Sequence, residues 1–177
     1  MARRVRAAGG VLTIGGDVAL ARALGADGVH LGGGSDAAAI AAARHTLRAG
    51  ALIGVSAHAP QEVAQVAAAG ADYVTLSPIF PTASKPGYGP ALGSEGIVAA
   101  RRAGLPVVAL GGIGSDGAAE CRGAGAAAVA IMGGLMRAGD PAGAARALLK
   151  AWEKRAPRNP DGEGASPLGT HPPFILR

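Results

Sequence analysis

The chain has 177 residues, of which 49% are hydrophobic and 16% are charged, a balance typical of a globular domain and not of a disordered chain. This length is enough for one domain with a substantial core and gives no reason to expect a second folded domain. The formal net charge is +5, but the basic residues are scattered and no aromatic side chains alternate with them, so we expect no nucleic-acid partner.

Other global features exclude further classes of protein. Cys121 is the only cysteine, so neither an intramolecular disulfide nor a cysteine-based metal cluster is possible. No apolar run is long enough to span a membrane, and the arginine-rich start lacks the apolar segment of a signal peptide. We therefore expect a soluble cytoplasmic protein with no membrane partner.

The first half of the chain alternates short apolar runs with capped helical patterns. Strands are expected over residues 10–14, 28–31 and 52–56. After each of the first two strands come glycines and then N-cap residues, Asp17 for one helix and Ser35-Asp36 for the next. Pro60 suits the first turn of a third helix, whose buried face would include Val63 and Val66.

The second half continues the alternation. Strands are expected over residues 71–76, 107–110 and 127–132, and helices over residues 93–104 and 116–122. Pro78 and Pro81 prevent the first of these strands from continuing. Ser115-Asp116 offers an N-cap for the second of these helices.

The last predicted element is a helix that starts at Asp140-Pro141 and carries Leu148 and Trp152 on its apolar stripe. After it the sequence is rich in Pro and Gly and is expected to be unstructured. We therefore divide the chain into one α/β domain over residues 1–155 and a disordered tail over residues 156–177.

A unit of strand, glycine-rich loop and helix recurs about every 20 to 30 residues, and six such units can be counted. Gly25, Gly70 and Gly125 each begin a Gly-Ala-Asp or Gly-Ala-Ala tripeptide between a helix and the next strand. Alternating helices and continuously apolar strands predict a parallel sheet covered by helices. In such folds ligands bind at the carboxyl ends of the strands, where the glycine pairs fall.

Two of these strand ends carry groups that suit a phosphate. After the fourth strand, Thr82 and Ser84 offer hydroxyl donors and Lys85 offers a cation. After the fifth strand, Gly111-Gly112 would let backbone N–H groups approach an anion closely. Because the carboxyl ends of parallel strands meet at one edge, the sequence predicts a phosphate-binding rim there.

Five motifs in this order resemble the thiamine-phosphate synthase and thiazole tautomerase superfamily. The matching stretches are Ala23-Leu24-Gly25-Ala26-Asp27-Gly28-Val29-His30-Leu31-Gly32, Ile53-Gly54-Val55-Ser56-Ala57-His58, Gly70-Ala71-Asp72-Tyr73-Val74, Ser77-Pro78-Ile79-Phe80-Pro81-Thr82-Ala83-Ser84-Lys85 and Val107-Val108-Ala109-Leu110-Gly111-Gly112-Ile113. The resemblance covers about residues 10 to 152. It implies a TIM (β/α)8-type barrel, here incomplete with about six strand–helix units.

The resemblance also implies an activity. The synthase of this superfamily is an enzyme of thiamine biosynthesis that joins an aminopyrimidine diphosphate to a thiazole phosphate, forming thiamine phosphate and releasing diphosphate. By similarity, Ser56 and Lys85 would be catalytic. The residues that would bind the substrates are His58, Thr82, Ser84, Gly111, Gly112, Met132 and Gly133.

The chain departs from the family pattern where Mg²⁺ would bind. Gly15-Gly16 stands where the family has Asn-Asp, and Gly33-Gly34-Ser35 stands where it has Gln-Glu-Asp, with Asp36 one place late. Since a hard cation prefers carboxylate oxygens, Asp36, and Asp17 with it, are the candidate ligands left for the Mg²⁺ that the resemblance implies.

Compared with an eight-unit barrel, the first two strand–helix units are expected to be the missing ones, so either the chain is a piece of a longer one or a partner completes the sheet. An incomplete barrel leaves strand edges open, which favours association, for example with a second copy of the chain. Two alternatives to the synthase stay open. A thiazole tautomerase needs a proton shuttle, and the family's histidine for it would stand where this chain has Ser77 or Pro78. A non-catalytic protein would bind a phosphorylated thiazole or thiamine phosphate without turnover. His30 and Cys121 are expected to be packed residues with no role in catalysis.

Overall fold

The structure, a computed structural model, describes residues 2–82, 89–154 and 174–176. Within these residues it contains one parallel sheet of seven strands, in which each strand pairs with the next in the sequence. The strands are β1 (Thr13–Gly15), β2 (Gly28–Leu31), β3 (Leu52–Ala57), β4 (Tyr73–Leu76), β5 (Val107–Leu110), β6 (Ala128–Ile131) and β7 (Phe174–Leu176).

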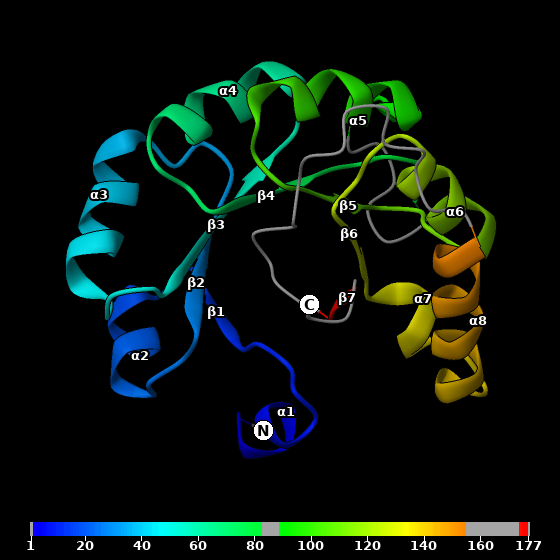
Figure 1. The fold of residues 1–177 in the computed structure, drawn as a ribbon, viewed down its shortest axis with the longest axis horizontal. Helices are drawn as coiled ribbons and strands as arrows, with labels where there is room; N and C mark the ends of the chain where they lie inside the picture. Colours follow the sequence, from blue (N-terminus) through cyan, green and yellow to red (C-terminus); the bar gives the residue numbers. More distant parts are fainter. Residues whose placement is uncertain (1, 83–88, 155–173, 177) are drawn as a thin grey trace.

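Helices cover the convex side of this curved sheet, as Figure 1 shows. They are α2 (Val18–Ala23), α3 (Ala37–Thr46), α4 (Pro60–Ala68), α5 (Gly93–Ala100) with the short 3-10 turn η1 (Arg101–Ala103), α6 (Ser115–Gly123) and α8 (Pro141–Lys154). The short helices α1 (Ala2–Ala7) and α7 (Gly133–Met136) complete the described part. Sequential parallel strands with helices on one side are the arrangement of a TIM-type barrel, here an open half-barrel.

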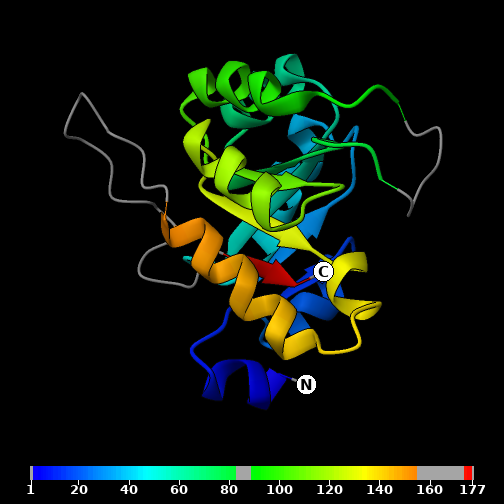
Figure 2. The same cartoon turned by 90° about the vertical axis from the view of Figure 1, so that its right-hand side faces the viewer.

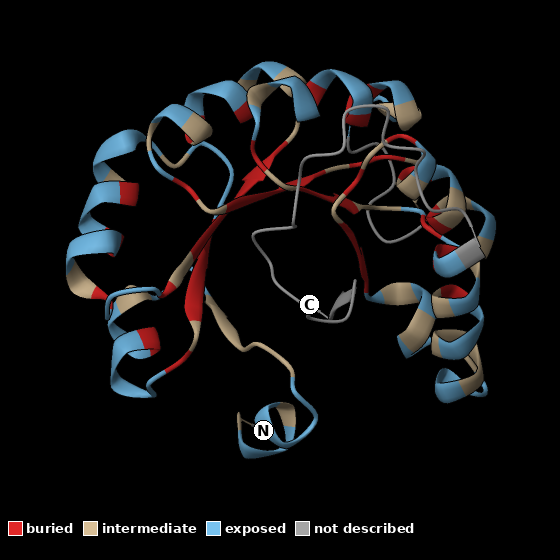
Figure 3. Cartoon of the chain, viewed as in Figure 1, coloured by how far each residue is buried: buried red, intermediate tan, exposed pale blue. Residues whose placement is uncertain are grey.

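The two faces of the sheet bury different kinds of side chain. Alternate strand residues such as Val29, Ile53 and Val74 point outward and pack with the helices in the main apolar core. Residues one place along, among them Tyr73 and Val108, form a smaller cluster on the concave face. Figure 3 shows strands β2 to β6 buried along most of their length and β1 only partly buried, while the helices expose the side that faces away from the sheet.

The repeated tripeptide marks the same turn in each unit. Gly25, Gly70 and Gly125 have positive φ angles of 56°, 87° and 93°, which glycine adopts without steric cost. The N–H of the next residue donates to a carbonyl five residues back, as from Ala26 to Ala21, the bond that ends many helices. These turns send the chain from each helix into the next strand.

Most predicted elements are confirmed, and the strands over residues 28–31 and 107–110 have the predicted bounds. One cap prediction is wrong. Gly114, in an extended conformation, is the N-cap of α6, so that Ser115 is the first residue of the helix and neither it nor Asp116 makes a capping hydrogen bond.

Three elements were not predicted: α1, α7 and β7. The six residues of α1 bury no side chain, so no apolar stripe marks this helix in the sequence. The four residues of α7 are too few to show a helical period. Strand β7 lies inside the stretch predicted to be a disordered tail, which is wrong for these three residues, because they pair with β6 and satisfy its outer edge. The rest of the predicted tail lies outside the described residues.

The strands all point to the same side of the molecule, where α7 lies, as the turned view in Figure 2 shows. The carboxyl ends of the strands therefore share one rim. In the described ranges, no helix has both the length and the apolar character needed to cross a membrane.

Candidate functional site

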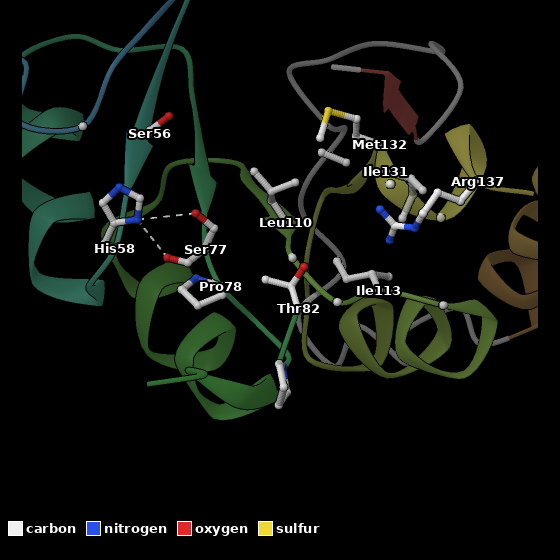
Figure 4. A pocket seen from close by; sticks show the side chains of 18 residues that line it. Ser56, His58, Ser77, Pro78, Thr82, Leu110, Ile113, Ile131, Met132 and Arg137 are labelled. Carbon is white, nitrogen blue, oxygen red and sulfur yellow. Dashed lines mark hydrogen bonds between the residues drawn. The ribbon is translucent and has the colours of Figure 1, made fainter. Parts of the chain in front are cut away.

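A pocket of about 630 Å³ opens at the carboxyl ends of β3, β4, β5 and β6. Figure 4 shows its lining side chains converging from these strand ends. The lining residues are Gly33, Ser56, His58, Ser77, Pro78, Pro81, Thr82, Leu110, Gly111, Gly112, Ile113, Gly114, Ala130, Ile131, Met132, Gly133, Gly134 and Arg137. The pocket thus lies where ligands of parallel α/β folds bind.

Two loops that follow β4 and β5 are joined at the centre of the pocket. The Ile79 N–H donates to the Leu110 carbonyl at 2.9 Å, and the Phe80 N–H donates to the Gly111 carbonyl at 3.1 Å. Gly112 has a φ of 65°, and a Cβ atom there would lie 2.7 Å from the Phe80 carbonyl oxygen. The glycines are therefore required both by the backbone conformation and by the closeness of the second loop.

Ser56 and His58 occupy the β3 side of the pocket. Ser56 is 8% exposed and belongs to a hydrogen-bonded cluster of buried side chains. His58 Nδ1 lies 2.9 Å from the Ser77 carbonyl oxygen, and since a carbonyl only accepts, Nδ1 carries the proton that it donates. The His58 backbone N–H donates to Glu62 Oε2 at 2.8 Å, which holds this loop against α4.

Arg137 lies on the opposite side of the pocket, at the end of α7, and Figure 4 shows its guanidinium group directed toward the cavity. Among the residues that the structure describes, none forms an ion pair with it. The sequence analysis missed Arg137 because it stopped at the glycine pair after β6. A search for cations within one helical turn of that pair would have found it.

Every residue that was predicted to bind or act on the substrates, and that the structure describes, lines this pocket. Those that line it are Ser56, His58, Thr82, Gly111, Gly112, Met132 and Gly133. Ser84 and Lys85 lie outside the described residues. The predicted rim therefore brings Thr82 together with the Gly111 and Gly133 edges, while the role of each residue stays a prediction.

Asp36, the predicted metal ligand, lies outside this pocket. Its Oδ1 accepts a hydrogen bond of 2.8 Å from the Ala39 N–H and caps α3. It lines a second, smaller pocket between α3 and α4, as does Glu62. In the described ranges, no three His, Cys, Asp or Glu side chains lie close enough together to hold a metal ion. This donor set does not fit a Mg²⁺ site made by the protein alone.

The open parallel barrel and its pocket at the strand ends place the molecule among the TIM-barrel-type α/β proteins. Within that class, the chain belongs to the thiamine monophosphate synthase family, whose model matches residues 1–135. The prediction from the sequence motifs is thereby confirmed at the level of the family.

Individual relatives agree with this assignment. The chain is 44% identical over 142 residues to a putative thiamine-phosphate synthase of Geobacter sulfurreducens, covering 80% of the chain and 66% of the relative. It is 45% identical over 147 residues to the thiamine-phosphate synthase of Chromobacterium violaceum, a match that covers 82% of the chain and 70% of the relative. The chain thus spans about two thirds of the length of these relatives.

A solved structure extends the likeness to the fold. The thiamine phosphate pyrophosphorylase of Pyrococcus furiosus superposes with a TM-score of 0.74 at 29% identity, over 86% of this chain and 72% of that one. The incomplete TIM-type barrel predicted from the sequence is confirmed.

Proposed function

We propose that the pocket couples an aminopyrimidine diphosphate to a thiazole phosphate, giving thiamine phosphate and diphosphate. The composition of the pocket carries this proposal. Thr82, Arg137 and the Gly111–Gly114 loop can donate hydrogen bonds to phosphate oxygens, while Leu110, Ile113 and Ile131 supply apolar surface for two heterocycles. Membership of the thiamine monophosphate synthase family supports the same substrates.

The reaction breaks one bond and forms another. The bond between the pyrimidine methylene carbon and the diphosphate oxygen breaks, and its electron pair leaves with the diphosphate. The lone pair of the thiazole nitrogen then forms a bond to the cationic methylene carbon. No proton has to move in either step, so the site needs anion binding and close positioning more than a general base.

The residues of the pocket have separate tasks in this scheme. Arg137 and Thr82 would hold phosphate oxygens, since a guanidinium and a hydroxyl donate at different angles to one oxyanion. The apolar side chains of Leu110 and Ile131 would exclude water from the carbocation. Water excluded in this way cannot capture the cation before the thiazole nitrogen does.

Magnesium stays a prediction. The described side chains do not form a carboxylate set for it, so no step is assigned to the metal. The assay should be run with added Mg²⁺ and with a chelator in its place.

One observation keeps the thiazole tautomerase as a second candidate. The imidazole of His58 lies in the pocket, bonded to Ser77, beside the positions where the tautomerase histidine was expected. An imidazole at this place could move a proton on a bound thiazole.

The test incubates the purified full chain with both substrates and measures diphosphate release and thiamine phosphate formation. Product that disappears when the thiazole phosphate is omitted supports the synthase. Isomerisation of a thiazole carboxylate without coupling would replace the synthase with the tautomerase. Binding of thiazole phosphate without either reaction would leave a binding protein and overturn the proposed enzyme.

A further inference from the structure

A cluster of buried polar side chains lies in the concave face of the sheet, next to the pocket. It consists of His30 on β2, Ser56 on β3, and Tyr73 and Thr75 on β4. Their exposed fractions are 5%, 8%, 2% and 2%. Only Ser56 of these four also lines the pocket, so it is the member through which the cluster can reach a ligand.

The histidine ring joins the cluster through both nitrogens. His30 Nδ1 lies 3.0 Å from the Tyr73 hydroxyl oxygen, and His30 Nε2 lies 3.0 Å from Ser56 Oγ. The Thr75 hydroxyl donates to Ser56 Oγ at 3.3 Å and lies 3.3 Å from His30 Nε2. Buried polar groups of this kind gain from a fully connected network and are costly when it is broken.

The acid strength of the partners indicates where the ring proton lies. A phenol is far more acidic than an aliphatic hydroxyl and is the better donor, so the Tyr73 O–H pairs with the unprotonated Nδ1 of His30. The neutral ring then carries its proton on Nε2 and donates it to Ser56 Oγ. Thr75 donates to the same oxygen, so Ser56 Oγ accepts both of these hydrogen bonds, and in this arrangement its own hydroxyl acts as a donor.

We propose that His30 is a positioning residue, which with Tyr73 fixes the Ser56 hydroxyl as a hydrogen-bond donor to a phosphate oxygen in the pocket. The inference deepens the proposed function and rests on it for the identity of the bound anion. It assigns to the buried histidine a role that the sequence analysis did not give it.

The packing of β3 supports this arrangement. A Cβ atom on Gly54 would lie 2.5 Å from His30 Nδ1 and would also overlap the Tyr73 ring. The two rings are tilted by 36° with centroids 5.5 Å apart. Gly54 is therefore the residue that makes room for the contact between His30 and Tyr73.

The first test measures the histidine itself. Nitrogen-15 NMR of the full chain, with the His30 signal assigned from its loss in a His30→Gln variant, should show a neutral ring protonated at Nε2. This readout needs no ligand and no turnover. A ring protonated at Nδ1 or at both nitrogens overturns the inference, whatever the synthase assay gives.

The second test is a double-mutant cycle with inorganic diphosphate as the probe, measured by calorimetry. Tyr73→Phe and His30→Leu should each weaken diphosphate binding about tenfold, the loss expected for one hydrogen bond to a charged group. In a Ser56→Ala background neither change should weaken it further, because both act through Ser56. His30→Gln, which keeps a donor near the Nε2 position, should restore most of the affinity.

Additive losses in the Ser56→Ala background would show a merely structural role for His30 and overturn the inference, as would failure of the unaltered chain to bind diphosphate. Melting curves identify any variant that does not fold, and if His30→Leu is one, Tyr73→Phe then carries the cycle. If the cycle behaves as expected and no thiamine phosphate forms, the positioning role stands and the proposed coupling reaction fails. If thiamine phosphate forms and the losses are additive, the coupling reaction stands and the positioning role fails.

Discussion

Arg137 brings a permanent positive charge to a pocket whose other described donors include the Thr82 hydroxyl and the backbone N–H groups of its glycines. Changing Arg137 to Ala should weaken binding of inorganic phosphate about tenfold, since one charge-assisted contact is lost. Isothermal calorimetry on the full chain measures the change. Arg146→Ala is the matched control. This exposed arginine lies on α8, forms an ion pair with Asp140 and does not line the pocket. Equal losses in both variants would assign the effect to net charge.

Gly112 is held in a conformation that other residues rarely adopt. Changing it to Ala should destabilise the fold by about 2 kcal/mol, through the strain of its positive φ and the overlap with the Phe80 carbonyl. Chemical denaturation measures this loss. Gly134→Ala in the same pocket should cost much less, because its Cβ atom would make only an ordinary contact of 3.6 Å with Ile131. A stability of Gly112→Ala equal to the parent would contradict the described loop geometry.

Several site residues could be predicted from the sequence because they follow strands whose ends are clear. Thr82 and Gly111-Gly112 are examples, and each lines the pocket. His30 is confirmed as a packed residue, but its contacts to Tyr73 and Ser56 join three strands and have no local signature. Spatial neighbours that are 26 and 43 residues apart cannot be paired without the sheet register.

The turn after each helix contains more than its glycine. In two of the three repeats an aspartate follows, and its carboxylate accepts a hydrogen bond from a backbone N–H close to the start of the preceding strand. Asp27 Oδ2 accepts from Leu12 at 2.9 Å, and Asp72 Oδ2 accepts from Ile53 at 2.6 Å and from Arg44 at 2.7 Å. The tripeptide therefore both ends a helix and joins adjacent strands.

Asp72→Ala should destabilise the protein by about 1 to 3 kcal/mol, because the N–H of fully buried Ile53 loses its acceptor. The partly exposed ion pair with Arg44 adds little to this loss. Asp72→Asn keeps an acceptor oxygen and should recover much of the stability, as measured by urea denaturation. If both variants lose the same stability, the charge and not the hydrogen bond is what matters.

The order and type of the main elements follow from apolar runs and caps, as with Asp17, whose side chain accepts from the Leu20 N–H. Positions that depend on the assembled sheet do not follow from local pattern. The apolar run predicts the first strand over residues 10–14, yet the strand forms at Thr13–Gly15, because its bounds are set by pairing with β2. Strand β7 is ordered by the edge of β6, which the preceding Pro- and Gly-rich sequence does not reveal.

For the molecule as a whole, the titration of one buried thiol makes the stability of the fold depend on pH in the alkaline range. Burial, with the nearby negative charge of Glu120, raises the pKa of Cys121 from 9.0 to about 12. In the unfolded chain the thiol loses its proton near pH 9, so above that pH the unfolded state binds fewer protons than the folded state. Stability should therefore be unaffected by this group below pH 9 and should fall as pH rises from 9 toward 12.

This expectation is checked by urea denaturation of the parent and a Cys121→Ala variant across that range, since other titrating groups are common to both. The variant is expected to lose stability at neutral pH through the cavity that it creates and to show a shallower decline above pH 9. Parallel pH curves for the two proteins would contradict a buried, neutral thiol.

Trp152 is the single tryptophan of the chain, buried on α8 beneath the guanidinium of Arg122, whose Cζ lies 5.1 Å from the centre of its ring. Tryptophan fluorescence consequently reports on one place in the fold, the contact between α8 and α6, which lies far along the sequence from β1. Thermal unfolding curves followed by tryptophan fluorescence and by circular dichroism will superimpose only if this contact and the rest of the sheet unfold together. The fluorescence of this one side chain therefore reports whether the two ends of the sheet unfold in a single transition.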